Sequence, residues 1–448
     1  MKQRPLTRSL SAWNLAFLGG LAVAMVAAAQ AHWPQWRGPG AQGHSSAKNI
    51  PLHWSESSNI VWKTEIPGRG WSSPVMEGDE IWVTTAIETP AKPEDAERRL
   101  KTNTGDQPLT LLEQVELRAV CVNRSTGRLV GNHLLMIEKE PQWVHKQNSF
   151  ASGTPVIEKG RLYAHFGAFG TACLDIRSGS VLWENRELKV QHENGPGSSA
   201  VLHKDLLIFH MDGSDAQFVA ALDKNTGKLA WKTSRSGKLN DNPQLKKSYG
   251  TPLLVAINGQ TQLISPGANW VYSYDPLTGT ELWKLSYEVL GFSTSAMPVF
   301  ADGVLYMTTG FMRPEVLAVK IPNSGEAEVL WRYNKGAPTI PSLLLVGQEL
   351  YFINDSGGML TCLDAASGRE HYRERLGGHH NAAPGFADGK IWIHNREGVT
   401  HVLQPGKTYS LLAKNELNPE LKATPAFTDG AIIMRTEKHL YRLGTSRN

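Results

Sequence analysis

The sequence is poor in cysteine, in net charge and in long apolar runs. Only three of its 448 residues are cysteine, which excludes a small fold held together by disulfides. The 46 Lys and Arg residues nearly balance 42 Asp and Glu residues, which argues against a polybasic nucleic-acid-binding protein. After residue 31 no segment is apolar enough to span a bilayer. With 41% hydrophobic residues, the chain is expected to fold rather than remain disordered.

The first 31 residues have the pattern of a signal peptide. Lys2, Arg4 and Arg8 precede an apolar run over residues 15–29, and Ala29-Gln30-Ala31 forms a small-x-small cleavage site. Cleavage after Ala31 leaves 43 basic against 42 acidic residues. We therefore expect export to the periplasm or beyond. No cysteine follows the cleavage site to carry a lipid, and retention of the segment as an uncleaved anchor is the alternative.

What the chain has in abundance is glycine, proline and tryptophan, and these recur at fixed spacing. The prolines at positions 252, 298, 341, 384 and 425 lie 41 to 46 residues apart, and each begins a set of short apolar strands separated by glycine turns. Periods of this length are typical of four-stranded antiparallel β-propeller blades. We predict an all-β, eight-bladed propeller as a single domain over residues 59–448, after a lead segment over residues 32–58.

Two further expectations follow from the repeat. The eighth set lacks its last strand, and residues 59–66 resemble one, so the N-terminal strand should complete the last blade and close the ring. Cys121, Cys173 and Cys362 occupy the same place in three different blades. Equivalent positions in separate blades are too far apart for a disulfide, so three free and buried thiols are expected.

The segments Leu222–Trp231 and Tyr274–Trp283, each with Asp, Thr-Gly and Trp at the same spacing, resemble the pyrroloquinoline quinone (PQQ)-like repeat. That repeat builds the quinoprotein dehydrogenases and the propeller of the Bam outer-membrane assembly complex. The segment over residues 33–39 also looks like the start of exported PQQ-like propellers. For a quinoprotein, the resemblance implies PQQ and calcium, with Trp270 as a stacking ring and Glu193 and Asn269 as ligands. No vicinal cysteine pair and no haem motif accompany them.

The loops that open on the centre of a propeller are the expected place for function. This face should present a polar set of mixed charge that suits a polar ligand or a peptide. The set comprises Arg69, Trp71, His145, His192, Asp212, Arg313, His379, His380 and Asn395. His379 and His380 precede an innermost strand, so one of them could serve as a metal ligand or a base. The alternative is that both are solvated histidines in a loop.

Blade one is irregular. Residues 87–117 replace a short loop, and Pro93 is placed to start a helical turn within them. Insertions of this length commonly act in binding, so a lid or docking arm is expected, with a solvated insertion as the alternative.

The sequence therefore predicts an exported, non-catalytic, monomeric scaffold. It should bind a protein, peptide or polysaccharide through its loop-rich face, and no nucleic acid or membrane partner is expected. The alternative function is that of a PQQ- and calcium-dependent oxidoreductase acting on an alcohol or a sugar.

Overall fold

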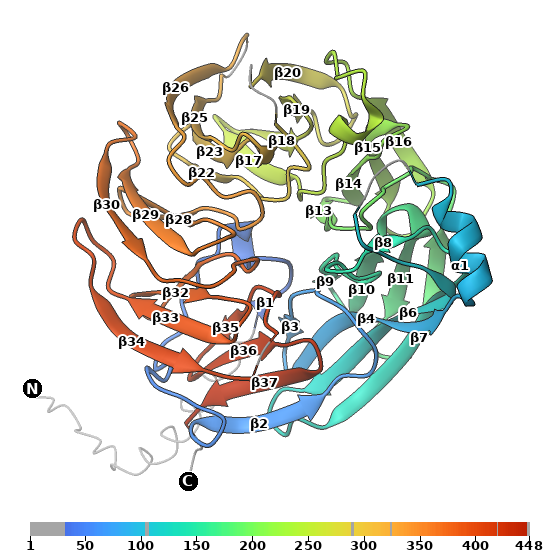
Figure 1. Ribbon diagram of the computed structural model, residues 1–448, viewed down its shortest axis with the longest axis horizontal. Helices are drawn as coiled ribbons and strands as arrows, with labels where there is room; N and C mark the ends of the chain where they lie inside the picture. Colours follow the sequence, from blue (N-terminus) through green and yellow to red (C-terminus); the bar gives the residue numbers. More distant parts are fainter. Residues whose placement is uncertain (1–31, 104–106, 288–290, 323–324, 419, 446–448) are drawn as a thin grey trace, which may run out of the picture. The chain divides into compact units, whose positions relative to one another are not determined.

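The computed structural model describes residues 32–445 apart from 104–106, 288–290, 323–324 and 419. The predicted signal peptide over residues 1–31 lies outside the described residues. Eight antiparallel blades of four strands each surround a common centre, and one further strand joins the sheet of blade one (Figure 1). This arrangement confirms the predicted eight-bladed propeller.

Blades one to four follow one another along the chain. From the centre outward, their strands are β3 (Val75–Glu77), β4 (Glu80–Pro90), β6 (Leu112–Asn123) and β7 (Leu129–Lys139); β9 (Val156–Glu158), β10 (Arg161–His165), β11 (Thr171–Asp175) and β12 (Val181–Asn185); β13 (Val201–His203), β14 (Leu206–Asp212), β15 (Gln217–Asp223) and β16 (Leu229–Ser234); β17 (Leu253–Ile257), β18 (Gln260–Pro266), β19 (Trp270–Tyr274) and β20 (Glu281–Ser286). Short 3-10 turns η2 (Gly167–Phe169) and η3 (Pro243–Leu245) lie in connecting loops.

Blades five to eight repeat the pattern. Their strands are β22 (Val299–Ala301), β23 (Val304–Thr308), β25 (Val316–Lys320) and β26 (Glu328–Tyr333); β27 (Leu344–Val346), β28 (Glu349–Ile353), β29 (Met359–Asp364) and β30 (Glu370–Arg375); β31 (Gly385–Ala387), β32 (Lys390–His394), β33 (Val399–Leu403) and β34 (Leu411–Glu416); β35 (Ala426–Thr428), β36 (Ala431–Arg435), β37 (His439–Gly444) and β2 (Ile60–Glu65). Because β2 pairs with β37 as the outermost strand of blade eight, the predicted closure of the ring by the N-terminal strand is confirmed.

The recurring tryptophans join neighbouring blades. The Trp183 ring lies against Gly227 of the next blade, where a Cβ would come within 2.5 Å of it, and its indole N–H donates to the Lys224 carbonyl at 3.0 Å. Gly227 has a φ of 72°, so this turn needs glycine both for its conformation and for the close approach. Trp62, Trp231 and Trp331 make the same pair of contacts with the following blade. These rings therefore pack between blades. The three cysteines are free and buried, as predicted.

A belt of hydroxyl hydrogen bonds, which was not predicted, also links the blades near the centre. In six of the eight blades, the residue two positions before the innermost strand donates its backbone N–H to a Ser or Thr hydroxyl at the same place in the next blade, as Ser73 does to Thr154 at 3.0 Å. The belt crosses the junction between the last and first blades, because the Thr424 N–H donates to the Ser73 hydroxyl at 3.0 Å. It is interrupted where the accepting position is Met297 or Ala383, whose side chains carry no hydroxyl.

Strands extend into the insertion in blade one from both sides. Within the predicted insertion over residues 87–117, β4 continues to Pro90 and β6 begins at Leu112. Between them, α1 (Pro93–Leu100) begins with Pro93 as expected and carries acidic residues in its first turn and arginines in its last, which suits the helix dipole. No residue of α1 is buried. The strand β5 (Leu109–Thr110) then pairs with β8 (Val144–His145).

The lead segment over residues 32–58 closes one end of the ring. Its strand β1 (His32–Trp33) pairs with β3 of blade one. After the turn η1 (Pro39–Ala41), the lead, in dark blue in Figure 1, contacts blades five to eight, beginning with Gln42, whose side-chain oxygen accepts from the Phe300 N–H at 2.9 Å. Ser45 N–H donates to the Phe386 carbonyl at 2.8 Å, and Lys48 N–H donates to the Asp429 carboxylate at 2.8 Å. Asp429 lies in a turn between a first and a second strand. The lead therefore covers the face on which these turns lie.

Candidate functional site

A central cavity of about 850 Å³ lies above the lead segment. Trp36 of the lead contributes to its lining. The remaining lining comes from the starts of the innermost strands and from the loops at the end of the ring opposite the lead. Among the lining residues are Trp71, His145, Asn148, Asn194, Lys247, Tyr249, Phe292, Phe311, Ile340, Asp355, Asn381 and Lys422. The lead thus closes one end of the channel, and the loop-rich face forms the mouth of the cavity.

Two of the nine residues predicted for the binding face, Trp71 and His145, line the cavity. Arg69 lies beside them, with its guanidinium 5.8 Å from the centre of the Trp71 ring and a hydrogen bond to the Lys146 carbonyl. Lys422 lies over the same ring at 4.1 Å. Two cationic side chains thus lie near one aromatic ring at the mouth.

The other predicted face residues lie elsewhere. His192, His380 and Asn395 are buried, and they are not among the residues that line the cavity. The ring nitrogens of His380 contact the carbonyls of His394 and Gly377, both at 3.0 Å. His379 is exposed and contacts Glu397 at 2.8 Å, and Arg313 is exposed outside the lining. The paired histidines thus serve different roles, one held by backbone and the other at the surface.

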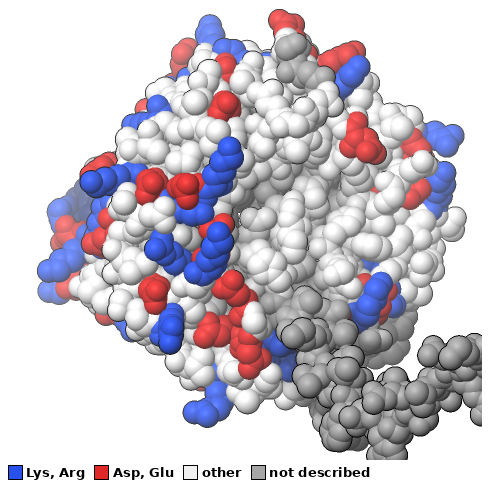
Figure 2. Space-filling model, turned by 180° about the vertical axis from the view of Figure 1, so that it is seen from behind, with Lys and Arg blue, Asp and Glu red and all other residues white. Residues whose placement is uncertain are grey.

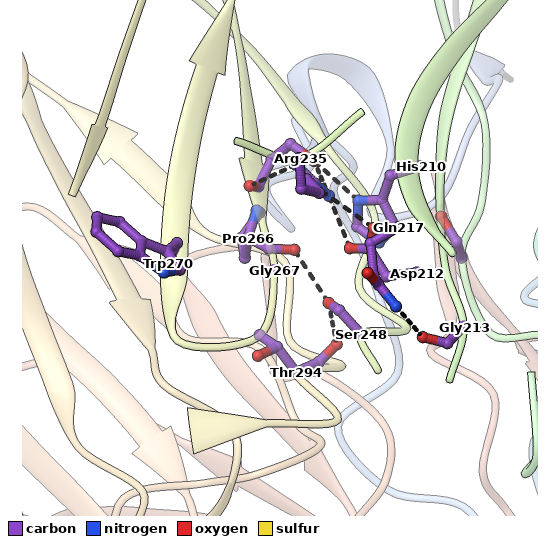
Figure 3. Close-up of polar contacts among 12 residues, drawn as sticks. His210, Asp212, Gly213, Gln217, Arg235, Ser248, Pro266, Gly267, Trp270 and Thr294 are labelled. Carbon is purple, nitrogen blue, oxygen red and sulfur yellow. Dashed lines mark hydrogen bonds and ion pairs between the residues drawn. The ribbon is translucent and has the colours of Figure 1, made fainter. Parts of the chain in front are cut away.

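Asp212 is buried instead of facing the mouth, because it forms an ion pair with Arg235 (Figure 3). The carboxylate accepts two hydrogen bonds from the guanidinium, at 2.8 and 3.1 Å. Arg235 also donates to the Ser265 hydroxyl at 2.9 Å, so the pair joins blade three to blade four. Burial raises the pKa of Asp212, and Arg235 opposes this effect. Burial also lowers the pKa of Arg235, but the Asp212 carboxylate outweighs it and the pKa is raised.

Three buried histidines occupy the second strands of three blades, a feature that sequence analysis overlooked. His165, His210 and His394 each contact a hydroxyl through Nδ1, at 2.8 to 2.9 Å. Burial lowers the pKa of His165 and of His394 to about 3 and lowers that of His210 well below its usual range. Burial penalises the charged form, so these rings are neutral. The recurrence of histidine near the ends of second strands was the feature of the sequence that could have predicted these buried rings.

The residues predicted to hold PQQ and calcium do not converge on the cavity. Trp270 points away from the Asp212 cluster (Figure 3), and its indole N–H donates to the Lys238 carbonyl at 2.9 Å. Glu193 accepts from the Ser214 hydroxyl at 3.0 Å, and the Asn269 N–H donates to the Gly291 carbonyl at 2.7 Å. None of the three lines the cavity. Within the described part of the chain, no three His, Cys, Asp or Glu side chains form a group that could hold a metal ion. The arrangement does not fit a calcium-bound quinone.

Apolar side chains are exposed at one part of the mouth. The short strands β21 (Gly291–Phe292) and β24 (Phe311–Met312) pair there, and the rings of Phe292 and Phe311 meet edge to face at 5.8 Å. Phe311 is 52% exposed and Met312 58% exposed. Ile340 of the next blade is also exposed and lines the cavity. We refer to Phe311, Met312 and Ile340 as the apolar rim.

Charged side chains of both signs are interspersed on the face shown in Figure 2, and the hollowed middle of that face is uncharged. A polyanion such as nucleic acid is bound by a surface on which positive charge dominates. Charges mixed in this way do not form such a surface on the face that the figure shows.

Comparison with known proteins yields both a family and a fold. The profile of the family described as outer membrane protein assembly factor BamB matches residues 52–199 and 172–324. A protein of that name from Moranella endobia (strain PCIT) is 22% identical over 255 residues, which cover 56% of this chain and 61% of the relative. The chain thus spans about three fifths of the length of the curated relative that it matches.

Solved structures at lower identity show the fold alone. BamB from Moraxella catarrhalis superimposes with a TM-score of 0.53 at 12% identity, covering 75% of this chain and 99% of that one. Quinohemoprotein alcohol dehydrogenase from Comamonas testosteroni superimposes with a TM-score of 0.63 at 11% identity, covering 94% and 82%. One propeller architecture therefore occurs in an assembly factor and in an enzyme. Since the family profile matches more than half of the sequence, this chain belongs to the family described as outer membrane protein assembly factor BamB, and its blades are PQQ-like repeats.

Proposed function

We propose that the chain is a non-catalytic, protein-binding scaffold of the cell envelope, and that its loop-rich face engages a partner in outer-membrane protein assembly. The apolar rim is the observation that carries this proposal. Phe311 and Met312 stand more than half exposed beside the cavity, where burying them against a partner would remove apolar surface from water. The names of the relatives support the choice of pathway.

The site supports binding better than catalysis. Aromatic rings and neutral amide side chains account for much of the cavity lining, and such groups bind extended polar chains by stacking and hydrogen bonding. Among the charged lining groups, the Asp355 carboxylate accepts hydrogen bonds from the backbone N–H groups of Thr339 and Ile340. The carboxylate therefore holds the loop that precedes β27 in place. A protein partner is favoured over a polysaccharide because the exposed rim is apolar.

A deletion and complementation experiment tests the proposed function. The host lacking this protein should show reduced outer-membrane proteins in its isolated outer membrane, and the wild-type chain should restore them. The variant Phe311→Ser/Met312→Ser should fail to restore them at equal protein levels. The matched control is Leu330→Ser, because Leu330 is 44% exposed on the outermost strand of blade five. Unchanged outer-membrane proteins in the deletion host would refute the proposed pathway.

A photo-crosslinking amino acid at position 311 tests direct contact. We expect one defined protein to crosslink from position 311 and not from position 330. Equal crosslinking from both positions would show that the apolar rim is not the docking surface.

We also propose that the chain is exported, cleaved after Ala31 and active as a monomer. The strand β1 begins at His32, directly after the predicted cleavage site, and the relatives are named for the outer membrane. In the described residues, no helix has the length and apolarity needed to cross a bilayer. Mass spectrometry of the native protein should identify His32 as its first residue, and an intact N-terminus would contradict cleavage.

A further inference from the structure

The cavity contains polar atoms without partners, and those atoms are hydrogen-bond donors. Trp71 is 8% exposed and lines the cavity, and its buried indole N–H has no acceptor among the described residues. The buried side-chain amide nitrogen of Gln107, which also lines the cavity, lacks an acceptor in the same part of the chain. A buried donor without an acceptor destabilises the fold unless a ligand or solvent satisfies it. The cavity is therefore matched to a ligand that supplies oxygen acceptors.

Lys247 adds a buried positive charge to the lining. It is only 3% exposed, and its ammonium donates to the Gln244 amide oxygen at 2.5 Å, a neutral partner. Burial lowers the pKa of Lys247, and the nearby Glu193 opposes this effect. Glu193 forms no ion pair with it within 4.0 Å in the described structure. An ammonium group can donate three hydrogen bonds. Lys247 can therefore donate to an anionic ligand in the cavity.

The other charged groups of the lining are already engaged. Lys422 contacts Glu420 at 3.0 Å and donates to the Gln147 carbonyl at 3.1 Å. The Asp355 carboxylate accepts from the backbone of the loop that precedes β27, as described above. Of the two lysines in the lining, Lys247 is thus the one that has no carboxylate within 4.0 Å among the described residues.

Lys247 is also next to the apolar part of the mouth. The Ser293 N–H donates to the Lys247 carbonyl at 2.7 Å, and Ser293 follows Phe292, whose ring contacts Phe311. A carboxylate at Lys247 would therefore lie close to an apolar group at the rim. An extended peptide can supply both groups from neighbouring residues.

We propose that the cavity binds a carboxylate of an extended, acidic protein segment, with Lys247, Trp71 and Gln107 as its donors and the apolar rim holding an adjacent apolar residue. The carboxylate belongs either to an Asp or Glu side chain or to the C-terminus of the partner. This inference rests on the proposed function, since it names the chemistry of the partner.

Selection from a random ten-residue peptide library displayed on yeast tests the inference with the purified chain as bait. Selected peptides should be enriched in Asp and Glu, with an apolar residue close by. Peptides synthesised with a free or an amidated C-terminus, and with Glu or Gln inside, then separate the two sources of the carboxylate.

The variants Lys247→Gln and Trp71→Phe should each weaken binding of the selected peptides by about tenfold or more, because each removes a donor to a charged group. Trp71→Phe keeps an aromatic ring in place. Lys320→Gln is the matched control, since Lys320 is an exposed lysine outside the cavity, and it should bind like the wild type. Thermal melting confirms that all variants are folded.

Three results would overturn the inference. The first is enrichment of sequences without acidic residues. The second is equal binding of acidic peptides by wild type and Lys247→Gln. The third is binding of oligogalacturonate, or of PQQ with calcium, without enrichment of acidic peptides, which would assign the cavity to a different ligand. If the rim variant fails to complement the deletion host while any of these results is obtained, the inference about the cavity fails and the proposed scaffold function is retained.

Discussion

The two ends of the ring are built on the same eight blades but are finished differently. At the closed end, the lead segment pairs with inner strands and turns of several blades, and it buries large side chains such as Trp33 and Trp54. At the mouth, Phe311 and Met312 remain exposed and cavity donors lack acceptors. We infer that the difference separates stability from recognition, because the closed end packs its large side chains within the chain whereas the mouth leaves apolar side chains exposed.

The largest effect is expected at the closed end. Trp33 is 2% exposed and contacts the ring of Phe427 at 5.7 Å. Trp33→Ala should lower the free energy of unfolding by about 3–5 kcal/mol, through lost burial and the cavity left behind. Urea denaturation measures this change, with Leu330→Ala as an exposed control. A loss below about 1 kcal/mol would show that the lead contributes little to the ring.

Acid should weaken the blades through their buried histidines. The pKa of His394 is about 3 in the folded chain and about 6.5 when unfolded. The unfolded state therefore binds the proton first, and stability present above pH 6.5 is lost as the pH falls toward 3. His394→Asn should remove about 2 kcal/mol of this acid sensitivity by pH 5. Urea denaturation at pH 7.5 and pH 5 measures the difference, and an unchanged pH dependence would contradict neutral burial of His394.

Breaking the hydroxyl belt should have a smaller effect. Ser73→Ala removes the acceptor of the Thr424 N–H at the junction between the last and first blades. An unsatisfied buried N–H costs about 1–3 kcal/mol. Ser73→Thr, which keeps the hydroxyl, is the control. Equal stability of the alanine and threonine variants would show that the belt is dispensable.

Completing the belt should stabilise the ring. The Ser342 hydroxyl accepts from the Met297 N–H at 2.9 Å. The next position of the belt is Ala383, which has no hydroxyl to accept from the Ser342 N–H. Ala383→Ser supplies that hydroxyl to the Ser342 N–H and should add about 0.5–1.5 kcal/mol. Thermal and urea denaturation measure the gain, and a loss of stability would show that position 383 has no room for an oxygen.

The sequence predicted the ring because strand period and turn chemistry are local. Short-range rules predict the glycine and aspartate turns and the spacing of the tryptophans. They also show that the eighth blade lacks its last strand at the C-terminal end of the repeat. The site was harder to predict because orientation is not local. The repeat predicts Asp212 at the mouth, but its carboxylate forms a buried ion pair with Arg235. Lys247 lines the cavity because of the conformation of its loop, which the repeat pattern does not predict.

The smallest effect on stability is expected at the mouth, where binding should change most. Phe311 and Met312 are exposed in the free chain, so Phe311→Ser/Met312→Ser should change the free energy of unfolding by less than about 0.5 kcal/mol per residue. The same variant should lose its partner, since apolar groups buried at an interface contribute to binding only in the complex. Denaturation and crosslinking of one preparation measure both quantities. If the rim variant loses as much stability as Trp33→Ala, the rim belongs to the folded core and the contrast between the two ends fails.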